Sequence, residues 1–300
     1  MRSGGNRPNC DGPASAGGDH ASIAGEKCRC DGKERDLLIQ LIVSDLDGTL
    51  LNGGQRIDPE DRKALRQAVQ RGTEICLASG RMQEELNQVA EAIGLSVHGI
   101  SQNGSFVQTR DGRSLLRKTF SLELAREIYD RTAEYDELFS MVCFEHRLLT
   151  PEKRGIADRI MKRLFAPIEV SPEIRQQLGR EFLPCKFSFF GDLELIRRMK
   201  RDLEERYSGE IDLFISDKDC LDVMPVGVSK GNGLQVLVHH LGLGPDEVLC
   251  IGDAFNDVSM FEMFPTFSFA MDHSPDGVKK KARMAAGSVA EAVHRVMVDS

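Results

Sequence analysis

The sequence has no long apolar run, and none of its apolar stretches approaches the ~20 residues that a membrane-spanning helix needs. Its N-terminal residues also lack the apolar segment of a secretory signal peptide. Positive charge is not in excess, because 39 Lys and Arg face 47 Asp and Glu, which gives a formal net charge of −8. These absences predict a cytoplasmic protein that binds neither membrane nor nucleic acid, with its eight cysteines present as thiols.

The chain has 300 residues and 41% hydrophobic content, which is enough for two modest domains. Residues 1 to 36 are rich in Gly and polar residues without apolar periodicity, so we predict a disordered tail there. Cys28 and Cys30, with Cys10 and His20 nearby, are candidate metal ligands. Their spacing differs from the Cys-x2-Cys of most zinc sites, and we favour free thiols.

Residues 41 to 50 read Leu-Ile-Val-Ser-Asp-Leu-Asp-Gly-Thr-Leu. The apolar start predicts a strand that is buried on both faces, as in a parallel sheet, and Gly48 allows a sharp turn where it ends. Asp45 and Asp47 therefore lie at the carboxyl end of a buried strand, where open α/β sheets bind ligands. Alternate residues of a strand share a face, so both carboxylates can reach one site.

Two such carboxylates can divide the work of a reaction. A free Asp has a pKa near ~3.9 and is a charged nucleophile at neutral pH without an activating base. A like charge beside the second carboxylate raises its pKa, which suits it to proton transfer. A turn with two solvated aspartates and the metal-binding Asp-x-Asp of glycosyltransferases are the alternatives, but no nucleotide-sugar pocket is visible.

The string resembles motif I of the haloacid dehalogenase (HAD) superfamily, whose phosphatase members read Asp-x-Asp-Gly-Thr. The next predicted strand ends in Ser79-Gly80-Arg81, which resembles motif II as it reads in the Cof-type subgroup. Backbone N–H groups and a hydroxyl at a helix start can bind phosphate, although an ordinary helix cap has the same residues. Asn103-Gly104 resembles the strand-end Asn-Gly of the subgroup, and is also a strong hairpin signal.

Lys230 stands just before a predicted helix at 234 to 241 and resembles the lysine of motif III. The surrounding glycines do not have the order of a nucleotide P-loop, and no buried strand leads into them. A lysine at a helix start opposes the helix dipole, so a purely structural role is unattractive. A solvated surface lysine is the alternative.

A further buried strand is predicted at 248 to 252, and it leads into Asp253, Asn256 and Asp257. The string Gly-Asp-x-x-Asn-Asp resembles motif IV, and its two aspartates can face one point across a strand-to-helix turn. Two unit charges 4 Å apart cost about 4 kcal/mol at an effective dielectric near 20. Four aspartates from motifs I and IV therefore require a cation, and a set of oxygen ligands favours Mg²⁺.

Residues 111 to 224 contain no such motif and alternate between helical and β-rich segments. We predict helical segments at 122–134, 152–165 and 193–207, β-rich stretches at 139–149, 185–190, 211–215 and 220–224, and a hairpin turn at Lys218-Asp219. Three polar residues in or beside these strands are substrate candidates, although solvated strand faces are the favoured interpretation: His146, Arg147 and Lys186. Residues 267 to 271 are predicted as the last strand, before a helix-rich end. The loop at 272 to 274 departs from the Gly-Asn-Ala of the subgroup.

The resemblance covers about residues 38 to 298 and implies an α/β fold. Residues 37–110 and 225–300 are expected to form a Rossmann-like HAD core, and 111–224 an inserted α+β cap of the C2 type. It also implies Mg²⁺-dependent hydrolysis of a small phosphorylated metabolite, a sugar phosphate or a phosphorylated cofactor, through an aspartyl-phosphate. A phosphomutase on the same scaffold and a non-enzymatic phosphosugar-binding protein are the alternatives.

The resemblance assigns a role to each motif residue. Asp45 is the expected nucleophile and metal ligand, and Asp47 the general acid/base with its backbone carbonyl on the metal. Ser79 and Lys230 are expected to hold phosphate oxygens. The remaining assignments are Asp253 and Asp257 as metal ligands, with Gly80, Arg81, Asn103 and Asn256 on the phosphate or substrate side.

Overall fold

The computed structural model describes residues 39–53, 55–152, 158, 160, 166–180, 182–217 and 219–297. The predicted tail at 1 to 36, with its cysteine pair, lies outside these residues, as does most of the predicted helix at 152–165. Lys218 of the predicted hairpin turn is also outside them, although the strands on either side of it pair antiparallel, as a hairpin requires.

The larger sheet has the strand order β14-β13-β12-β1-β2-β3-β4-β5. Its strands are β1 (Leu41–Ser44), β2 (Glu74–Ala78), β3 (His98–Ser101), β4 (Phe106–Gln108), β5 (Ser114–Arg117), β12 (Val248–Gly252), β13 (Phe267–Met271) and β14 (Met284–Ala286). β1 pairs in parallel with β2 and β12, whereas β4 and β5 form an antiparallel edge. The helices of this part are α1 (Pro59–Gln70), α2 (Gln83–Ile93), α7 (Lys230–Leu241), α8 (Val258–Met263), α9 (Asp276–Lys279) and α10 (Val289–Met297), with short 3₁₀ turns η1 (Gln102–Gly104), η2 (Pro245–Glu247) and η3 (Phe255–Asp257).

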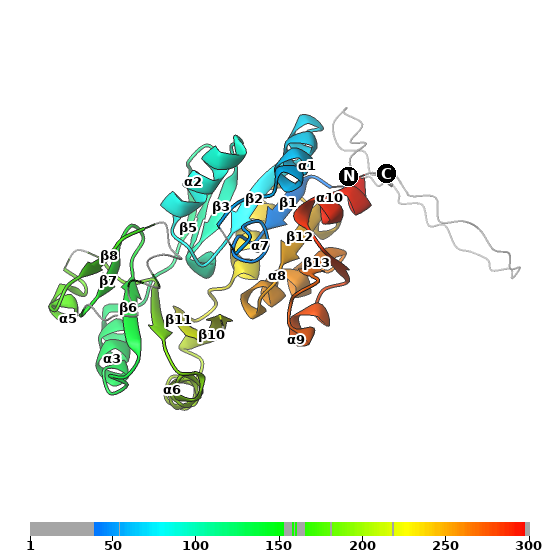
Figure 1. Cartoon of the computed structure of the whole chain (residues 1–300). Helices are drawn as coiled ribbons and strands as arrows, with labels where there is room; N and C mark the ends of the chain where they lie inside the picture. Colours follow the sequence, from blue (N-terminus) through cyan, green and yellow to red (C-terminus); the bar gives the residue numbers. More distant parts are fainter. Residues whose placement is uncertain are drawn as a thin grey trace, which may run out of the picture. The chain divides into compact units, whose positions relative to one another are not determined.

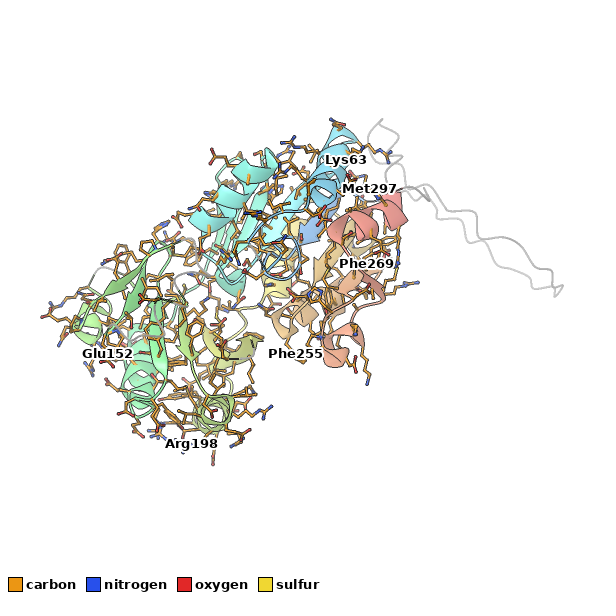
Figure 2. The ribbon with its side chains drawn as sticks, in the orientation of Figure 1. Lys63, Glu152, Arg198, Phe255, Phe269 and Met297 are labelled. Carbon is orange, nitrogen blue, oxygen red and sulfur yellow. The ribbon has the colours of Figure 1, made fainter. Side chains whose placement is uncertain are left out.

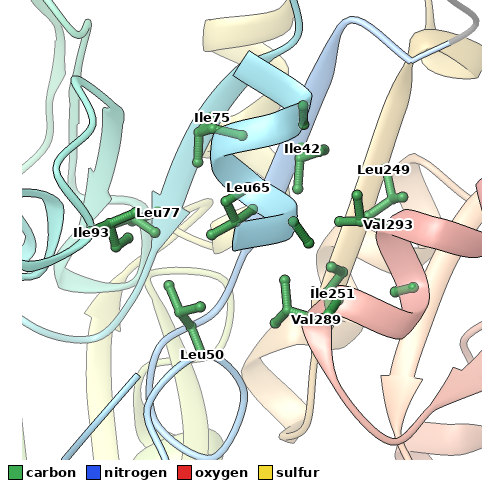
Figure 3. Close-up of a cluster of buried hydrophobic side chains, with 14 of the residues drawn as sticks. Ile42, Leu50, Leu65, Ile75, Leu77, Ile93, Leu249, Ile251, Val289 and Val293 are labelled. Atoms are coloured by element: carbon green, nitrogen blue, oxygen red, sulfur yellow. The ribbon is translucent and has the colours of Figure 1, made fainter. Parts of the chain in front are cut away.

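Strand β1 is buried on both faces, which confirms the prediction made from its apolar run. Ile42 packs with Leu65 of α1 and Val293 of α10 on one face of the sheet (Figure 3). Leu41 and Val43 pack on the opposite face with residues of α7 and α8. Alternate residues of a strand point to opposite faces, so a fully apolar strand is stable only where helices cover both of them. The predicted α/β architecture is confirmed.

The smaller sheet lies between β5 and α7 in the chain and has the order β10-β11-β9-β6-β7-β8. Its strands are β6 (Phe139–Cys143), β7 (Leu148–Thr150), β8 (Ile168–Val170), β9 (Lys186–Phe190), β10 (Ile211–Asp217) and β11 (Cys220–Pro225), and its helices are α3 (Leu122–Thr132), α5 (Ile174–Gln177) and α6 (Leu193–Arg206). Phe187 and Phe189 of β9 pack with residues of α3 and α6, which cover one face of this sheet (Figure 1). The predicted α+β insertion is confirmed.

Two short strands lie at the edges of the larger sheet. β14 pairs in parallel with β13, so the prediction that the strand at 267 to 271 is the last one is wrong. Its three residues, Met-Ala-Ala, have little β propensity and give no alternating signal. β5 pairs with β4 in the larger sheet, and the predicted division at residues 110 and 225 stays a prediction. No helix within the described ranges is both long enough and apolar enough to cross a bilayer.

Candidate active site

The carboxyl ends of β1, β2 and β12 lie at one edge of the larger sheet, because these strands are neighbours and parallel. The residues that directly follow β1 and β2 still form backbone hydrogen bonds with neighbouring strands of the sheet. The Asp45 N–H donates to the Ile251 carbonyl at 2.9 Å, and the Ser79 N–H donates to the Ile100 carbonyl at 2.9 Å. The sheet therefore brings the predicted motifs I, II and IV to the same edge.

Lys230 is the first residue of α7 and is almost fully buried, with 1% exposure. Its Nζ lies 2.6 Å from Oδ1 of Asp45 and 2.6 Å from Oδ1 of Asp257. Burial acts to lower the pKa of Lys230, but Asp257 and Asp45 outweigh burial and raise it above its ordinary value. Lys230 is thus a charged bridge between two carboxylates, and the alternative of a solvated surface lysine is wrong.

Asp257 is fully buried and ties the turn after β12 together. Its Oδ2 accepts hydrogen bonds from the N–H groups of Asp253 and Ala254, each at 2.9 Å. A Cβ at Gly252 would lie 2.4 Å from Cγ of Asp257, so only glycine allows this close approach. The turn holds the carboxylates of Asp253 and Asp257 beside the end of β1.

Asp45, Asp253 and Asp257 each present a carboxylate oxygen, and these oxygens lie within 4.8 Å of one another. Oδ2 of Asp45 is buried and has no hydrogen-bond partner among the described residues. Burial is the main cause that raises the pKa of both Asp45 and Asp253, and the neighbouring carboxylates raise it further. One ammonium faces three carboxylates, so the site has a deficit of positive charge. A set of oxygen ligands with this deficit fits a Mg²⁺ ion.

Asp47 lies at the edge of this cluster, and its side chain is half-exposed. Arg81 holds it with two hydrogen bonds, from Nε to Oδ2 at 2.8 Å and from Nη2 to Oδ1 at 2.6 Å. Arg81 is itself buried and also donates to Gln55 and Glu85. Arg81 was expected on the phosphate side, and here its guanidinium fixes the orientation of Asp47.

Asn103 connects several parts of the site. It has a positive φ of 58°, follows Gln102 with a φ of 48°, and lies in the connection between the antiparallel strands β3 and β4. Its Oδ1 accepts from Nδ2 of Asn256 at 3.1 Å, and a Cβ at Gly80 would lie 3.1 Å from the same oxygen. The Asn-Gly pair therefore both turns the chain and faces the site, so the two interpretations of it hold together.

Ser79 is buried beside this group, with 2% exposure. Its Oγ accepts from the Arg81 N–H at 3.2 Å, which leaves the hydroxyl proton available to an acceptor in the site. The ordinary cap and the phosphate-holding role are therefore compatible at this position.

A haloacid dehalogenase-like hydrolase family matches residues 42–297 of the chain. The chain belongs to this family. The hydrolase is 26% identical to a chloroplastic endoribonuclease YBEY of Arabidopsis thaliana over 85% of its own length, but it spans only 46% of that protein. It is 28% identical to an HMP-PP phosphatase of Serratia proteamaculans, over 74% of this chain and 80% of the relative.

Solved structures of the same fold match this chain over nearly all of their own length. A haloacid dehalogenase-like hydrolase of Bacteroides thetaiotaomicron superposes with a TM-score of 0.74 at 24% identity, over 86% of this chain and 99% of the other. A HAD subclass IIB sugar phosphatase gives a TM-score of 0.71 at 18% identity, over 83% and 94%. The predictions of a Cof-type HAD member, of its fold and of a phosphatase enzyme are confirmed.

The structure also places the polar candidates of the smaller sheet, and it brings Asp222 and His273, which the sequence did not single out, beside the site of the hydrolase. Lys186 is buried, and its Nζ donates to the Gly80 carbonyl at 2.7 Å, so its interpretation as part of a solvated strand face is wrong. His146 is exposed, as expected. Asp222 accepts from Nδ2 of Asn103 at 3.0 Å. Nε2 of His273, in the loop that departs from the subgroup, lies 3.6 Å from Oδ2 of Asp253.

Proposed function

We propose that this hydrolase is a Mg²⁺-dependent phosphatase of small phosphorylated metabolites that forms an aspartyl-phosphate on Asp45. The observation that supports this most directly is the state of the Asp45 carboxylate. Lys230 holds one of its oxygens, while the other is buried and unpartnered beside two further aspartates. An oriented carboxylate oxygen with a free lone pair in a water-poor site is a suitable nucleophile for phosphorus.

Asp45, Asp253 and Asp257 would hold the Mg²⁺ ion, and the family resemblance adds the backbone carbonyl of Asp47. When bound, the ion supplies positive charge that polarises the phosphoryl group and offsets the repulsion between the carboxylates. The fit rests on the clustered carboxylate oxygens and on the excess of three carboxylates over the one ammonium of Lys230 beside them.

The first half of the reaction transfers the phosphoryl group to the protein. Oδ2 of Asp45 attacks phosphorus, the bond from phosphorus to the ester oxygen breaks, and Asp47 protonates the leaving oxygen. Lys230 and Ser79 hold phosphoryl oxygens during this step. In the second half Asp47 takes a proton from a water molecule, which attacks phosphorus, and the bond to Asp45 breaks to release inorganic phosphate.

Arg81 orients Asp47 in this scheme. Its two hydrogen bonds hold both oxygens of the Asp47 side chain at the edge of the carboxylate cluster. To protonate a leaving group, the Asp47 carboxyl must carry a proton and turn from Arg81 toward the ester oxygen.

The similarity to an HMP-PP phosphatase supports the proposed substrate class, and a sugar phosphatase has the same fold. We infer that this enzyme cleaves small phosphorylated metabolites of this kind, with HMP-PP and sugar phosphates as the first compounds to assay. The predicted cytoplasmic location agrees with such substrates.

The test is phosphate release from p-nitrophenyl phosphate and from a metabolite panel, with Mg²⁺ and with EDTA. We expect release that depends on Mg²⁺ and that falls more than about 10³-fold in Asp45→Asn, because an amide is no nucleophile. Asp58→Asn is the matched control, since Asp58 is an exposed N-cap of α1 and Asn caps a helix as well as Asp does. Normal release by Asp45→Asn would refute the assignment. Isomerised product without free phosphate would indicate a phosphomutase.

A further inference from the structure

The segment from Leu51 to Ile57 connects motif I to α1 and folds back on itself. Leu51 and Ile57 form an antiparallel bridge, and the Asn52 N–H donates to the Arg56 carbonyl at 3.0 Å. Oδ1 of Asn52 accepts in turn from the Arg56 N–H at 3.1 Å. We call residues 51–57 the connecting hairpin, because these contacts hold its two ends side by side.

One residue of the connecting hairpin reaches the active site. Oε1 of Gln55 accepts from Nη2 of Arg81 at 2.6 Å, and the same nitrogen donates to Oδ1 of Asp47 at 2.6 Å. Gln55 has a φ of 58°, a conformation that is uncommon for residues other than glycine. Such a conformation persists only where surrounding contacts maintain it. The position of the hairpin is therefore linked to the orientation of Asp47 through Arg81.

The connecting hairpin also lines a pocket of about 400 Å³ together with α1 and α2, which we call the hairpin pocket. A pocket of this size accommodates a small organic molecule. None of the residues proposed to bind phosphate or Mg²⁺ is among its described lining residues. Gln55 does line it, so one side chain borders the pocket and also contacts Arg81. Four side chains give the pocket an apolar lining: Leu51, Ile57, Val89 and Ala92.

Two arginines line the hairpin pocket, Arg56 from the hairpin and Arg62 from α1. Neither guanidinium has a hydrogen bond or an ion pair with any residue that the structure describes. Nε of Arg62 is nevertheless buried. A guanidinium has five N–H donors, and a buried donor without an acceptor reduces stability. The two arginines thus present unused donors and positive charge to the pocket.

Other arginines of this chain have carboxylate partners. Arg131 donates from Nε and Nη2 to the two oxygens of Asp202, and Arg175 contacts Asp130 in the same way. The chain has a formal net charge of −8, so acidic partners are plentiful. The lack of such a partner for the two arginines of the hairpin pocket, within the described ranges, points to an acceptor that comes from outside the chain.

We propose that the hairpin pocket binds a small organic molecule with a dianionic phosphate group, and that this ligand activates the enzyme. The two guanidinium groups balance the two negative charges and donate hydrogen bonds to the phosphate oxygens. The apolar lining contacts the rest of the ligand. The binding does not depend on the proposed phosphatase function, whereas the activation rests on it.

The activation follows from the elements that carry the two arginines. Arg56 belongs to the hairpin and Arg62 to α1, so an anion that contacts both joins the hairpin to the helix. Such a ligand binds most tightly when the hairpin has the position seen here, and it shifts the population toward that position. There Gln55 holds Arg81, and Arg81 holds Asp47. An occupied pocket therefore raises kcat by increasing the fraction of enzyme in which Asp47 is oriented.

The binding test is calorimetric titration of the full chain with phenylphosphonate in EDTA, at an alkaline pH where this probe is a dianion. Without Mg²⁺ the clustered carboxylates repel a dianion from the active site, so the titration reports the hairpin pocket. We expect one binding site per chain. The affinity should be at least about 10-fold lower in Arg62→Met, which keeps the apolar stem of the side chain but loses the donors.

Lys63→Met is the matched control for the binding test, since Lys63 is the next residue on α1, is exposed and is not among the described lining residues. Circular dichroism checks that each variant is folded, and Arg56→Met at an exposed position repeats the test should Arg62→Met not fold. No binding to the wild type, or equal affinities in the arginine and lysine variants, would overturn the inference. Benzoate has the same ring with a single negative charge, and equally tight binding of benzoate would overturn the assignment of a dianion.

The activation test measures kcat with Mg²⁺ at saturating p-nitrophenyl phosphate, or the best substrate of the metabolite panel, with and without phenylphosphonate. Competition at the active site raises KM alone, whereas the proposed ligand should raise kcat at least about 2-fold in the wild type and in Lys63→Met. Gln55→Asn tolerates the positive φ but has too short a side chain to reach Arg81, so it should keep the binding and lose the rise.

The outcomes of the activation test separate the two proposals. Binding without a rise in kcat in the wild type, or a rise that persists in Gln55→Asn, would overturn the link between the hairpin pocket and Asp47. No phosphate release from any substrate would overturn the proposed function and the activation with it. The binding test would then still decide whether the pocket holds the ligand.

Discussion

Lys230→Met removes the single ammonium that separates the buried carboxylates of Asp45 and Asp257. Two ion pairs at 2.6 Å contribute about 6 kcal/mol each at an effective dielectric near 20. The cost of burying the ammonium, several kcal/mol, offsets much of that. Removing one partner of a buried ion pair leaves uncompensated charge and typically costs about 3–5 kcal/mol. We therefore expect Lys230→Met to lower the free energy of unfolding by about 3–5 kcal/mol in EDTA.

The assay is urea unfolding followed by far-ultraviolet circular dichroism, because the chain contains no Trp for fluorescence. Each protein is measured in EDTA and again with Mg²⁺. We expect Mg²⁺ to restore part of the lost stability, since a ligand at 100 times its Kd adds about 2.7 kcal/mol to the folded state. The variant should nevertheless lack phosphatase activity, because Lys230 also orients the nucleophile.

Lys63→Met is the matched control for this experiment. Lys63 lies on the outside of α1 with a side-chain exposure of 61% and pairs only loosely with Glu60 at 3.3 Å (Figure 2). Exposed pairs of this type add little to stability, so the control should unfold like the wild type. If Lys230→Met in EDTA were also as stable as the wild type, the argument that Lys230 compensates the buried carboxylates would be refuted.

Two further predictions concern Gly48 and His98. Gly48→Ala should raise the Mg²⁺ concentration needed for half-maximal activity at least about 10-fold, because its Cβ would lie 2.4 Å from Oδ2 of Asp253. Gly209 is the control, since it has a similar φ and no atom within 4 Å of an added Cβ. Gly209→Ala should therefore reduce stability without changing the Mg²⁺ requirement. Equal activation constants in both variants would contradict this. Burial lowers the pKa of His98 below 6.5, and its Nδ1 accepts from the Arg110 N–H at 3.2 Å, so it is neutral in the fold. Stability should thus be lost as pH falls through 6.5, and denaturation of His98→Gln should show a weaker pH dependence.

The grouping of the candidate site residues at one edge of the larger sheet was predictable because their signals are local. A buried strand reads as an apolar run, and the turn at its end reads as glycine and aspartate, as at Gly48 and Asp45. Parallel pairing then brings separate strand ends to one edge without further information from the sequence. The bridging contacts of Lys230 follow from the same placement, since α7 starts at that edge.

The contacts that could not be predicted join residues far apart in the sequence, and the residues around each one do not indicate which side chain it will contact. Arg81 and Asp47 are 34 residues apart, and nothing in either segment indicates that the guanidinium holds the carboxylate. The alternation of β9, Lys-Phe-Ser-Phe-Phe, correctly separates two faces, but period alone does not tell whether the polar face meets water or another part of the protein. Lys186 was therefore placed in solvent when it lies against Gly80.

The difference between the contacts that could be predicted and those that could not has a physical cause. The phosphate end of a substrate is the same in every phosphatase reaction, so short, fixed motifs can supply its contacts, the role proposed above for Ser79 at the end of β2. The leaving group differs between substrates, and its contacts must come from side chains that can vary without disturbing those motifs. Lys186 and Asp222 stand on a separate sheet and contact the motifs through the Gly80 carbonyl and the Asn103 amide. Side chains of the smaller sheet therefore support Gly80 and Asn103 without belonging to any of the short motifs, which is why the motifs alone did not reveal them.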